Sequence, residues 1–375
     1  MLVTAAFLAI LSTAAIFLLI WRWRHFNYFN VLGIPGPKPN LIWGNIREYH
    51  SMEIYKVIGK WLDKYGDVFG FFNGDVPFVV IRDLDFIEDV FVRNFQNFVN
   101  RGITVMTDQM HPIMGQSILH VGGYKWKNIR TSVSLSLTSK KLKMMMQYIQ
   151  EDTSVFVQRL KEYADTGKEV QMLHNFETTA TALSYLIYAL AKHQDVQEKV
   201  RKEVIDAVGT NGELDYETVT KKLKYMGSVV DETLRLYPPG LSFVTRQAKE
   251  DYVYNGILFK AGTCFMVPQY QVQRDPRYWP NPLEFKPERH SSDNEAALKK
   301  TAYTAFGVGP RQCVGTRLSL LEMRYVAGKM LQKYRLELGP SQKGTMELGQ
   351  YAMVSTPANG PWILLRSLTN ENIGR

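Results

Sequence analysis

Residues 306–315 of the chain read FGVGPRQCVG, so one cysteine stands among three glycines and a proline. Glycine lets the backbone turn sharply and approach a flat partner closely, and proline fixes a turn. A cysteine in such a loop is a nucleophile, a metal ligand or merely a small apolar residue, which is its commonest role. A nucleophile needs a nearby histidine as its base, and the helical stretch that follows, TRLSLLEMRYVAGKML, contains none. The loop therefore favours metal ligation over nucleophilic catalysis for Cys313, with the small apolar residue as the plain alternative.

Length and composition limit the fold and the partners. With 375 residues, 45% of them hydrophobic, the chain can bury a large core as one big domain or two ordinary ones. Only Cys264 and Cys313 occur, which excludes a disulfide framework and fits a reducing compartment. The net charge of +9 comes from scattered Lys and Arg, so we expect membrane lipid or an acidic protein as a partner. No nucleic-acid recognition motif is present, and we expect no nucleic-acid partner.

The first 21 residues, MLVTAAFLAILSTAAIFLLIW, carry no charged side chain, and a basic and aromatic stretch from Arg22 to His25 follows at once. This run is long enough to cross a bilayer as a helix, and its flank suits the headgroup layer. A cleaved secretory signal is the alternative, but such signals begin with a basic segment and have a shorter apolar run. We therefore predict a single transmembrane anchor over residues 1–21. Positive charge follows the span, which predicts that the rest of the chain lies in the cytosol.

The remainder reads as a linker followed by one mostly helical domain. Prolines between residues 33 and 40 forbid a helix, which indicates a basic, proline-rich linker over residues 22–40. An aromatic and β-branched stretch with an Asn-Gly-Asp hairpin signal covers residues 67–83. Helical periodicity dominates afterwards, above all from Glu177 to Val208, and short strands return near the carboxyl end. We predict a mainly α fold with a minor β part, with its domain over residues 41–375.

The loop around Cys313 resembles the haem-binding loop of the cytochrome P450 monooxygenases. Two further segments agree in order and spacing: DETLRLYPP at 231–239 resembles the family's Glu-x-x-Arg helix, and FKPERH at 285–290 resembles its Pro-Glu-Arg segment. The resemblance implies the cytochrome P450 fold and a haem b (iron protoporphyrin IX) cofactor, whose metal is ligated by Cys313. The other loop positions that match the family and would bind the cofactor are Phe306, Gly309, Arg311 and Gly315, and Gly307 matches as well.

The resemblance also assigns cations to the two propionates of haem. Arginine suits carboxylates best because its guanidinium binds them through two parallel hydrogen bonds. Trp126 and Arg130 lie one helical turn apart and resemble the family's Trp-x-x-x-Arg propionate clamp. Arg101, Arg246 and Arg311 fall where related sequences place further propionate ligands. For Arg101 and Arg246 the alternative is an ordinary surface residue.

Glu232 and Arg235 lie three residues apart on one predicted helix, which taken alone indicates a solvated ion pair worth roughly 0.2–0.5 kcal/mol. The resemblance implies instead that the pair is buried and completed by Arg289 behind the cysteine loop. His290 departs from the family, which usually has an aromatic residue there, and we expect the imidazole to pack similarly.

The segment ETTATALSYLIYALAKHQDVQEKV resembles the family's central helix from its Glu-Thr-Thr onward. It implies that Thr178 is the alcohol of a catalytic proton relay and that Glu177 is its acidic neighbour, since oxygen cleavage requires protons delivered above the haem. In this sequence Asn175 is a candidate N-cap, so the helix would begin at residue 176 and the relay would lie in its fraying first turn.

The sequence just before this helix differs from that of the family. GKEVQM at 167–172 resembles the segment that opens a long stretch of helices forming the roof over the substrate, yet LHNFETT follows at once. Relatives are substantially longer, so we expect an internal deletion near residues 172–175 and a fold that lacks the substrate-roof helices. A skipped exon or an assembly error would produce such a junction. His174 falls where a small residue normally faces the iron, so its imidazole is a candidate second iron ligand, the alternative being a solvent-exposed side chain.

Taken together, the resemblance implies a microsomal oxidoreductase: a haem-thiolate monooxygenase of the endoplasmic reticulum membrane that inserts one atom of O2 into a small apolar substrate. It implies electrons from a NADPH-dependent flavoprotein reductase, with a b-type cytochrome as a further candidate donor. Two alternatives stay open. One is an oxygen-independent isomerase of the thromboxane-synthase kind, against which the Glu177–Thr178 pair argues. The other is a non-catalytic, membrane-tethered haem-binding remnant, which a pocket without its roof favours.

Overall fold

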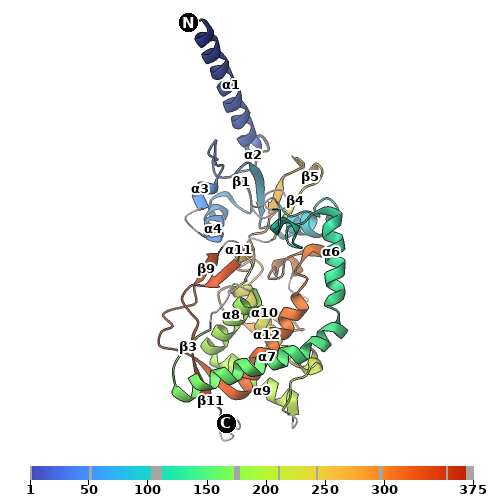
Figure 1. The fold of residues 1–375 in the computed structure, drawn as a ribbon, viewed down its shortest axis with the longest axis vertical. Coiled ribbons are helices and arrows are strands. Elements are labelled where there is room, and N and C mark those ends of the chain that lie inside the picture. The colour runs from blue at the N-terminus through green and yellow to red at the C-terminus, as the bar shows by residue number, and fades with distance from the viewer. Residues whose placement is uncertain are drawn as a thin grey trace. The chain divides into compact units, whose positions relative to one another are not determined.

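The computed structural model describes residues 2–49, 53–102, 112–172, 178–209, 212–241, 244–294, 299–351 and 354–368 (Figure 1). The longer helices are α1 (Leu2–Phe26), α4 (Ile54–Tyr65), α6 (Gly123–Ser136), α7 (Ser139–Thr166), α8 (Thr178–Lys192), α9 (Gln194–Val208), α10 (Lys224–Leu236) and α12 (Thr316–Lys333). The shorter ones are α2 (Tyr28–Val31), α3 (Ile46–Tyr49), α5 (Leu84–Glu88) and α11 (Gln269–Val272). The strands are β1 (Val68–Asn73), β2 (Val76–Ile81), β3 (Val170–Gln171), β4 (Thr245–Gln247), β5 (Tyr252–Tyr254), β6 (Ile257–Phe259), β7 (Cys264–Met266), β8 (Tyr334–Leu338), β9 (Leu348–Tyr351), β10 (Val354–Pro357) and β11 (Trp362–Ser367). The predicted mainly α fold with a minor β part is confirmed.

The chain divides into two compact units. The first consists of Met1–Trp126 and Val244–Pro268, and the second of Lys127–Phe243 and Gln269–Arg375. In the first unit a four-stranded sheet has the order β1-β2-β7-β4, in which β2 and β7 are parallel and the other pairs are antiparallel. The hairpin expected within residues 67–83 is present, with Val68 opposite Ile81 and a left-handed Gly74 at its tip. Helix α4 packs the side chains of Val57, Ile58, Trp61 and Leu62 into the core of this unit.

At the amino end, α1 extends five residues beyond the uncharged run, as far as Phe26, and α2 follows directly. Residues 3–26 are long and apolar enough to cross a membrane by length and composition. The stretch from 34 to 39, with its three prolines, lies in no helix or strand, as expected. The first residues of the predicted linker are thus helical, and only its later part is the non-helical segment that proline dictates.

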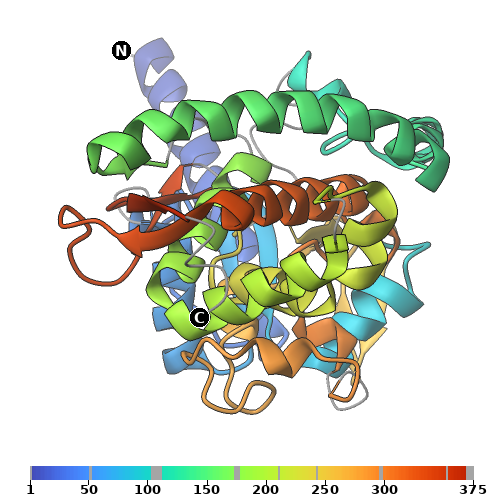
Figure 2. The ribbon, with the colours of Figure 1, turned by 90° about the horizontal axis from the view of Figure 1, so that it is seen from below.

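The second unit is built around α8 and α12. Most side chains of α8 between Thr181 and Ala191 are buried, as expected for a helix rich in apolar residues on all sides. Helix α12 packs against α7, α8, α9 and α10, and Figure 2 shows α7 in green running alongside α12 in red. A three-stranded sheet of order β3-β11-β8 and the pair β9–β10 complete the unit. Because α12 follows the cysteine loop directly, this packing holds the loop at the edge of a solid core.

The helical stretch expected from Glu177 to Val208 is two helices, α8 and α9, separated at His193. The ring of His193 stacks on Phe285 with the ring centroids 4.7 Å apart. The side chain of Gln194 donates hydrogen bonds to the carbonyl oxygens of Ala191 (2.7 Å) and Leu336 (2.8 Å). The break therefore depends on contacts with distant segments, which helical periodicity does not report.

Candidate functional site

The loop that carries Cys313 is closed by its own backbone. The amide of Cys313 donates a hydrogen bond to the carbonyl of Phe306 (2.8 Å), and the amide of Gln312 donates one to the carbonyl of Gly309 (3.0 Å). Gly307 (φ +86°) and Gly309 (φ +71°) adopt left-handed backbone, which would strain any other residue. Cys313 itself is exposed, so the turn presents its thiol outward and does not bury it as a small apolar residue.

The structure brings α6 to this loop. Arg130 donates a hydrogen bond through Nη1 to the carbonyl oxygen of Gln312 (2.6 Å), next to Cys313. Burial lowers the pKa of Arg130, and the negative charge of an ionised Cys313 thiol acts in the opposite direction. The guanidinium of Arg130 thus lies within electrostatic reach of the sulfur. The thiolate is the form of cysteine that ligates metals.

The other residues of this loop that were assigned to the cofactor lie at the edge of the core or within it. Arg311 is 2% exposed, Phe306 packs against the core of the second unit, and Gly315 stands at the N-cap of α12. The second unit therefore contains six of the residues assigned to the cofactor, namely Cys313, Arg130, Phe306, Gly309, Arg311 and Gly315.

Three further predicted residues belong to the first unit. Trp126 is buried and meets Phe95 edge to face, with the ring centroids 5.8 Å apart. Arg246 is 1% exposed, and its guanidinium lies 4.8 Å from the ring centroid of Phe91, so it is not an ordinary surface residue. Asn100, the residue before Arg101, forms an isolated antiparallel bridge with Gln247, the residue after Arg246.

The residues expected to deliver protons are only partly described. Glu177, Asn175 and His174 lie outside the described residues. Thr178 is the first residue of α8 and is exposed. Its neighbour Thr179 shares a 3.2 Å hydrogen bond with the hydroxyl of Ser319 on α12, a contact that no sequence motif indicated.

The predicted ion pair of α10 is confirmed as a buried cluster. Both side chains are fully buried, and Arg235 binds Glu232 through two hydrogen bonds, of 2.7 and 2.9 Å. Arg289 donates a third hydrogen bond to Glu232 (3.3 Å), and the backbone amide of Lys286 donates a fourth (2.9 Å). The ring of His290 lies 3.0 Å from the same carboxylate, so this departure from the family adds a partner and does not merely fill space. The remaining donors of the two arginines bind the carbonyl oxygens of Gln273, Pro282, Glu284, Pro280 and Asn281.

The Glu232 cluster predicts a loss of stability in acid. Burial alone would raise the pKa of Glu232, but the hydrogen bonds from His290 and Arg235 outweigh it and lower the pKa to about 2. The unfolded chain takes up this proton near pH 4.5. The stabilisation is therefore complete above that pH and is lost as the pH falls toward 2, about 3 kcal/mol in all. Urea titrations at pH 6 and pH 3 should differ by about 2 kcal/mol from this group, because pH 3 lies between the two pKa values. Glu232→Gln should bind about one proton fewer on unfolding in this range, and an unchanged pH slope in that variant would contradict the assignment.

The donor set fits haem. A haem ligated by thiolate needs one cysteine for its iron and cations for its propionates, and the exposed Cys313 with Arg130 and Arg311 would supply both kinds of group. Among the residues that the structure describes, no group of three or more His, Cys, Asp or Glu side chains is placed to hold a bare metal ion.

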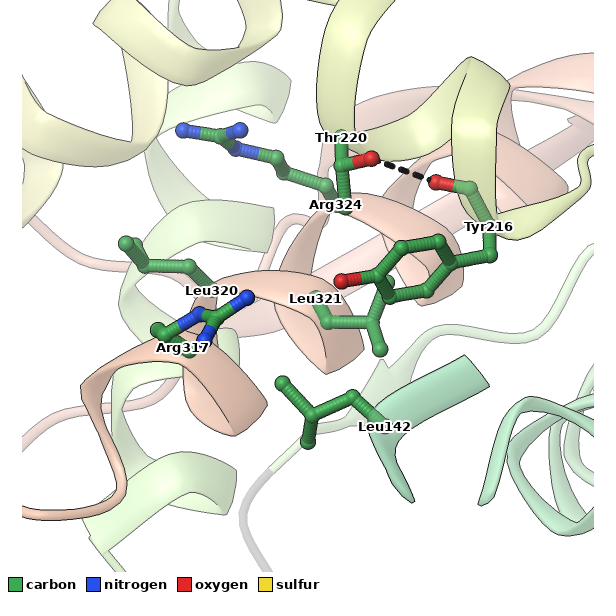
Figure 3. Close-up of a pocket in the computed structure, with 7 residues that line it drawn as sticks. All are labelled: Leu142, Tyr216, Thr220, Arg317, Leu320, Leu321 and Arg324. Carbon is green, nitrogen blue, oxygen red and sulfur yellow. Dashed lines mark hydrogen bonds between the residues drawn. The ribbon is translucent and has the colours of Figure 1, made fainter. Parts of the chain in front are cut away.

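A separate pocket lies beside α12 (Figure 3). Its volume is about 170 Å³, and it holds none of the residues assigned to the cofactor. The side chains around it are Leu142, Tyr216, Thr220, Arg317, Leu320, Leu321 and Arg324. Small-molecule sites usually enclose about 300–1,000 Å³, so this pocket is too small for a large apolar substrate.

Comparisons with known proteins agree with these features. The profile of the family described as "Cytochrome P450" matches residues 34–176 and 170–364. Cytochrome P450 3A1 of Rattus norvegicus is 26% identical over 449 residues, covering 84% of this chain and 87% of the relative. Lithocholate 6-beta-hydroxylase of Mesocricetus auratus is 26% identical over 462 residues, with coverages of 88% and 90%. Cytochrome P450 6B1 of Papilio polyxenes is 24% identical over 501 residues, with coverages of 96% and 99%. Each alignment is longer than this 375-residue chain, so the relatives contain residues with no counterpart here.

Proposed function

Because the chain belongs to the cytochrome P450 family, we propose that it is a membrane-anchored haem-thiolate monooxygenase that inserts one atom of O2 into an apolar organic substrate. The observation that carries this proposal is the exposed thiol of Cys313 on a loop closed by its own amides, with Arg130 bound beside it. The membership suggests monooxygenase activity in general. The substrate, the redox partner and haem b as the particular cofactor are parts of the proposal.

Haem, when bound, supplies the iron at which O2 is activated. The chain's own part is to hold that group and to shape the chemistry around it. Cys313 is the proposed ligand of the iron, and Arg130 is bound to the backbone beside it. The further residues proposed to contact the cofactor are Phe306, Gly309, Arg311 and Gly315 in the loop and Arg101, Trp126 and Arg246 in the first unit. Thr178 and Glu177 remain the proposed proton-relay pair.

A second part of the proposal concerns the missing length. The two ranges matched by the family profile meet at residues 170–176, which supports an internal deletion there. The deletion would remove the substrate-roof helices together with the first half of the central helix, so that α8 is its remaining half. Without a roof, water reaches the reacting centre and diverts the electrons from the substrate. The alternative of a haem-binding remnant without turnover follows from the same observation.

Turnover tests both parts of the proposal. The quantity to measure is the product formed per NADPH consumed, for this chain and for a chain in which the segment near 172–175 is restored from a relative. We expect most NADPH to be consumed without product in the present chain, because an open site floods with water, and tighter coupling in the restored chain. Equally tight coupling in both would show that the roof is dispensable. No product from either would favour the non-catalytic remnant.

We further propose the endoplasmic reticulum as the membrane, with the two units on the cytosolic side and a NADPH-dependent flavoprotein reductase as the electron donor. The net charge of +9 supports an acidic partner, and a b-type cytochrome is a further candidate. Four exposed lysines on α6 and α7 form the proposed docking surface, namely Lys125, Lys127, Lys140 and Lys141.

The lysine surface predicts a salt effect on electron transfer. Reduction of the haem by the reductase should slow as salt rises, because exposed charges are screened beyond about 10 Å at 0.1 M. A Lys140→Gln/Lys141→Gln variant should be slower at low salt and less sensitive to added salt. Lys202→Gln on α9, another exposed lysine, is the control and should behave as the unmodified chain does. Reduction that is independent of salt would contradict the proposed surface.

A further inference from the structure

The pocket beside α12 is built from three segments of the second unit (Figure 3). Leu142 comes from the first turn of α7, and Tyr216 and Thr220 come from the segment around η4 (Thr218–Lys222). The four residues that α12 contributes have the i, i+3, i+4, i+7 spacing of one helix face, namely Arg317, Leu320, Leu321 and Arg324. Because helices supply most of its wall, the pocket is preformed.

The deep part of the pocket is apolar and small. Leu142 and Leu321 are 1% and 2% exposed, and the half-buried Leu320 and the ring of Tyr216 lie beside them. The volume of about 170 Å³ equals that of about six water molecules, at about 30 Å³ each in the liquid. An apolar group of the size of a single ring therefore fits, and a long alkyl chain does not.

Two polar groups on the wall are left without a partner. Arg317 donates a hydrogen bond through Nη2 to the hydroxyl of Ser139 (2.5 Å), which orients its guanidinium, while its Nε and Nη1 bind no other described residue. The hydroxyl of Tyr216 likewise has no partner within the described part of the chain, whereas that of Thr220 donates to the carbonyl oxygen of Tyr216 (2.7 Å). Figure 3 shows the hydroxyl of Tyr216 and the guanidinium of Arg317 directed toward one another.

The charge around the pocket favours an anion. Arg324 adds a second cation to the wall, and its buried Nε has no hydrogen-bond partner among the described residues. Asp231 lies within electrostatic reach of Arg324, but no ion pair joins the two side chains. Glu217, in the same segment as Tyr216, is already paired with Lys221 (2.6 Å). Negative charge brought by a ligand would therefore meet arginines that no carboxylate of the described chain neutralises.

We propose that this pocket binds a small aromatic carboxylate, with its ring among the leucines and its two carboxylate oxygens on Arg317 and on the hydroxyl of Tyr216. A carboxylate suits the site because its oxygens match these two donors, while a phosphate brings further oxygens that an apolar wall would leave unsatisfied. The ring removes apolar surface from water, which a bare anion does not. No residue of this site is assigned to the cofactor, so the site is independent of the proposed monooxygenase.

Equilibrium dialysis with radiolabelled benzoate tests the site without any need for turnover. The full chain is held in lipid nanodiscs, and empty nanodiscs give the blank. We expect saturable binding of one benzoate per chain. Arg317→Gln should weaken it at least about tenfold, because a charge-assisted hydrogen bond is lost, and Tyr216→Phe should weaken it by a smaller factor. Arg317→Lys keeps the charge and should lie between the unmodified chain and Arg317→Gln.

Two further variants separate this pocket from other places where benzoate could bind. Leu320→Phe places a larger side chain in the pocket at a half-buried position, so it should abolish binding while leaving Arg317 in place. Arg159→Gln removes an exposed arginine of α7 that does not line the pocket, and it should leave binding unchanged.

Each remaining outcome would overturn the proposal. Binding that survives both Arg317→Gln and Leu320→Phe would place benzoate elsewhere on the chain. Benzyl alcohol that binds as tightly as benzoate would show that the carboxylate is not recognised. Inorganic phosphate that competes as strongly as benzoate would make the site a general anion site and refute the aromatic class. Absence of saturable binding in the unmodified chain would refute the site itself.

Discussion

Cys313→Ala is expected to abolish the strongly red-shifted Soret band that the reduced, CO-bound protein shows when a thiolate ligates the haem iron. The expectation follows from the loop, in which the hydrogen bond from the amide of Cys313 to the carbonyl of Phe306 and the left-handed glycines hold the sulfur outward. Alanine keeps the backbone and removes only the ligand, so the spectrum should change while the fold persists. The difference spectrum and the total haem content are to be measured on the same sample, which separates loss of the ligand from loss of haem.

The second cysteine provides a matched control for this spectrum. Cys264 on β7 is buried in the sheet core of the first unit. Cys264→Ala removes a thiol of the same kind and should leave the Soret band in place, although it opens a small cavity. A retained band in Cys313→Ala, or a lost band in Cys264→Ala at full haem content, would remove the central claim about the ligand.

Glu232→Gln is expected to lower the free energy of unfolding by about 3–5 kcal/mol, because it leaves the guanidinium groups of Arg235 and Arg289 buried beside a neutral amide. The side chain keeps its shape, so the loss reports on charge and not on packing. Urea unfolding of each variant at neutral pH measures it. Such a loss is a large share of the 5–15 kcal/mol by which folded proteins are usually stable.

Glu288→Gln is the control for that measurement. Glu288 lies in the same short helix as Arg289 but is half-exposed, and it pairs with Lys199 at 2.9 Å on the surface. Exposed ion pairs contribute about 0–1 kcal/mol, so this variant should change stability little. Equal losses in the two variants would show that burial does not determine how much the Glu232 cluster contributes to the free energy of unfolding.

The local features of this chain were predictable because each depends on neighbouring residues. A glycine-rich turn around Cys313, a hairpin at Gly74 and an uncharged helix before Arg22 follow from backbone freedom, turn chemistry and hydropathy over short windows. The end of α7 at the left-handed Gly167 is of the same kind. The buried Glu232–Arg235–Arg289 cluster is different, because its burial was expected from a family resemblance and not from the residues alone.

Contacts between distant residues could not be read in this way. Arg130 reaches the backbone beside Cys313 from a position 182 residues earlier, His290 joins the carboxylate of Glu232 across 58 residues, and Arg22 binds the carbonyl of Leu41. Each depends on how helices and loops pack, and packing is a sum of many weak contacts that no short window contains. The sequence by itself thus determined which groups are present and which turns carry them. Packing decided which of those groups meet, because only close approach in the fold turns a charge or a donor into a bond.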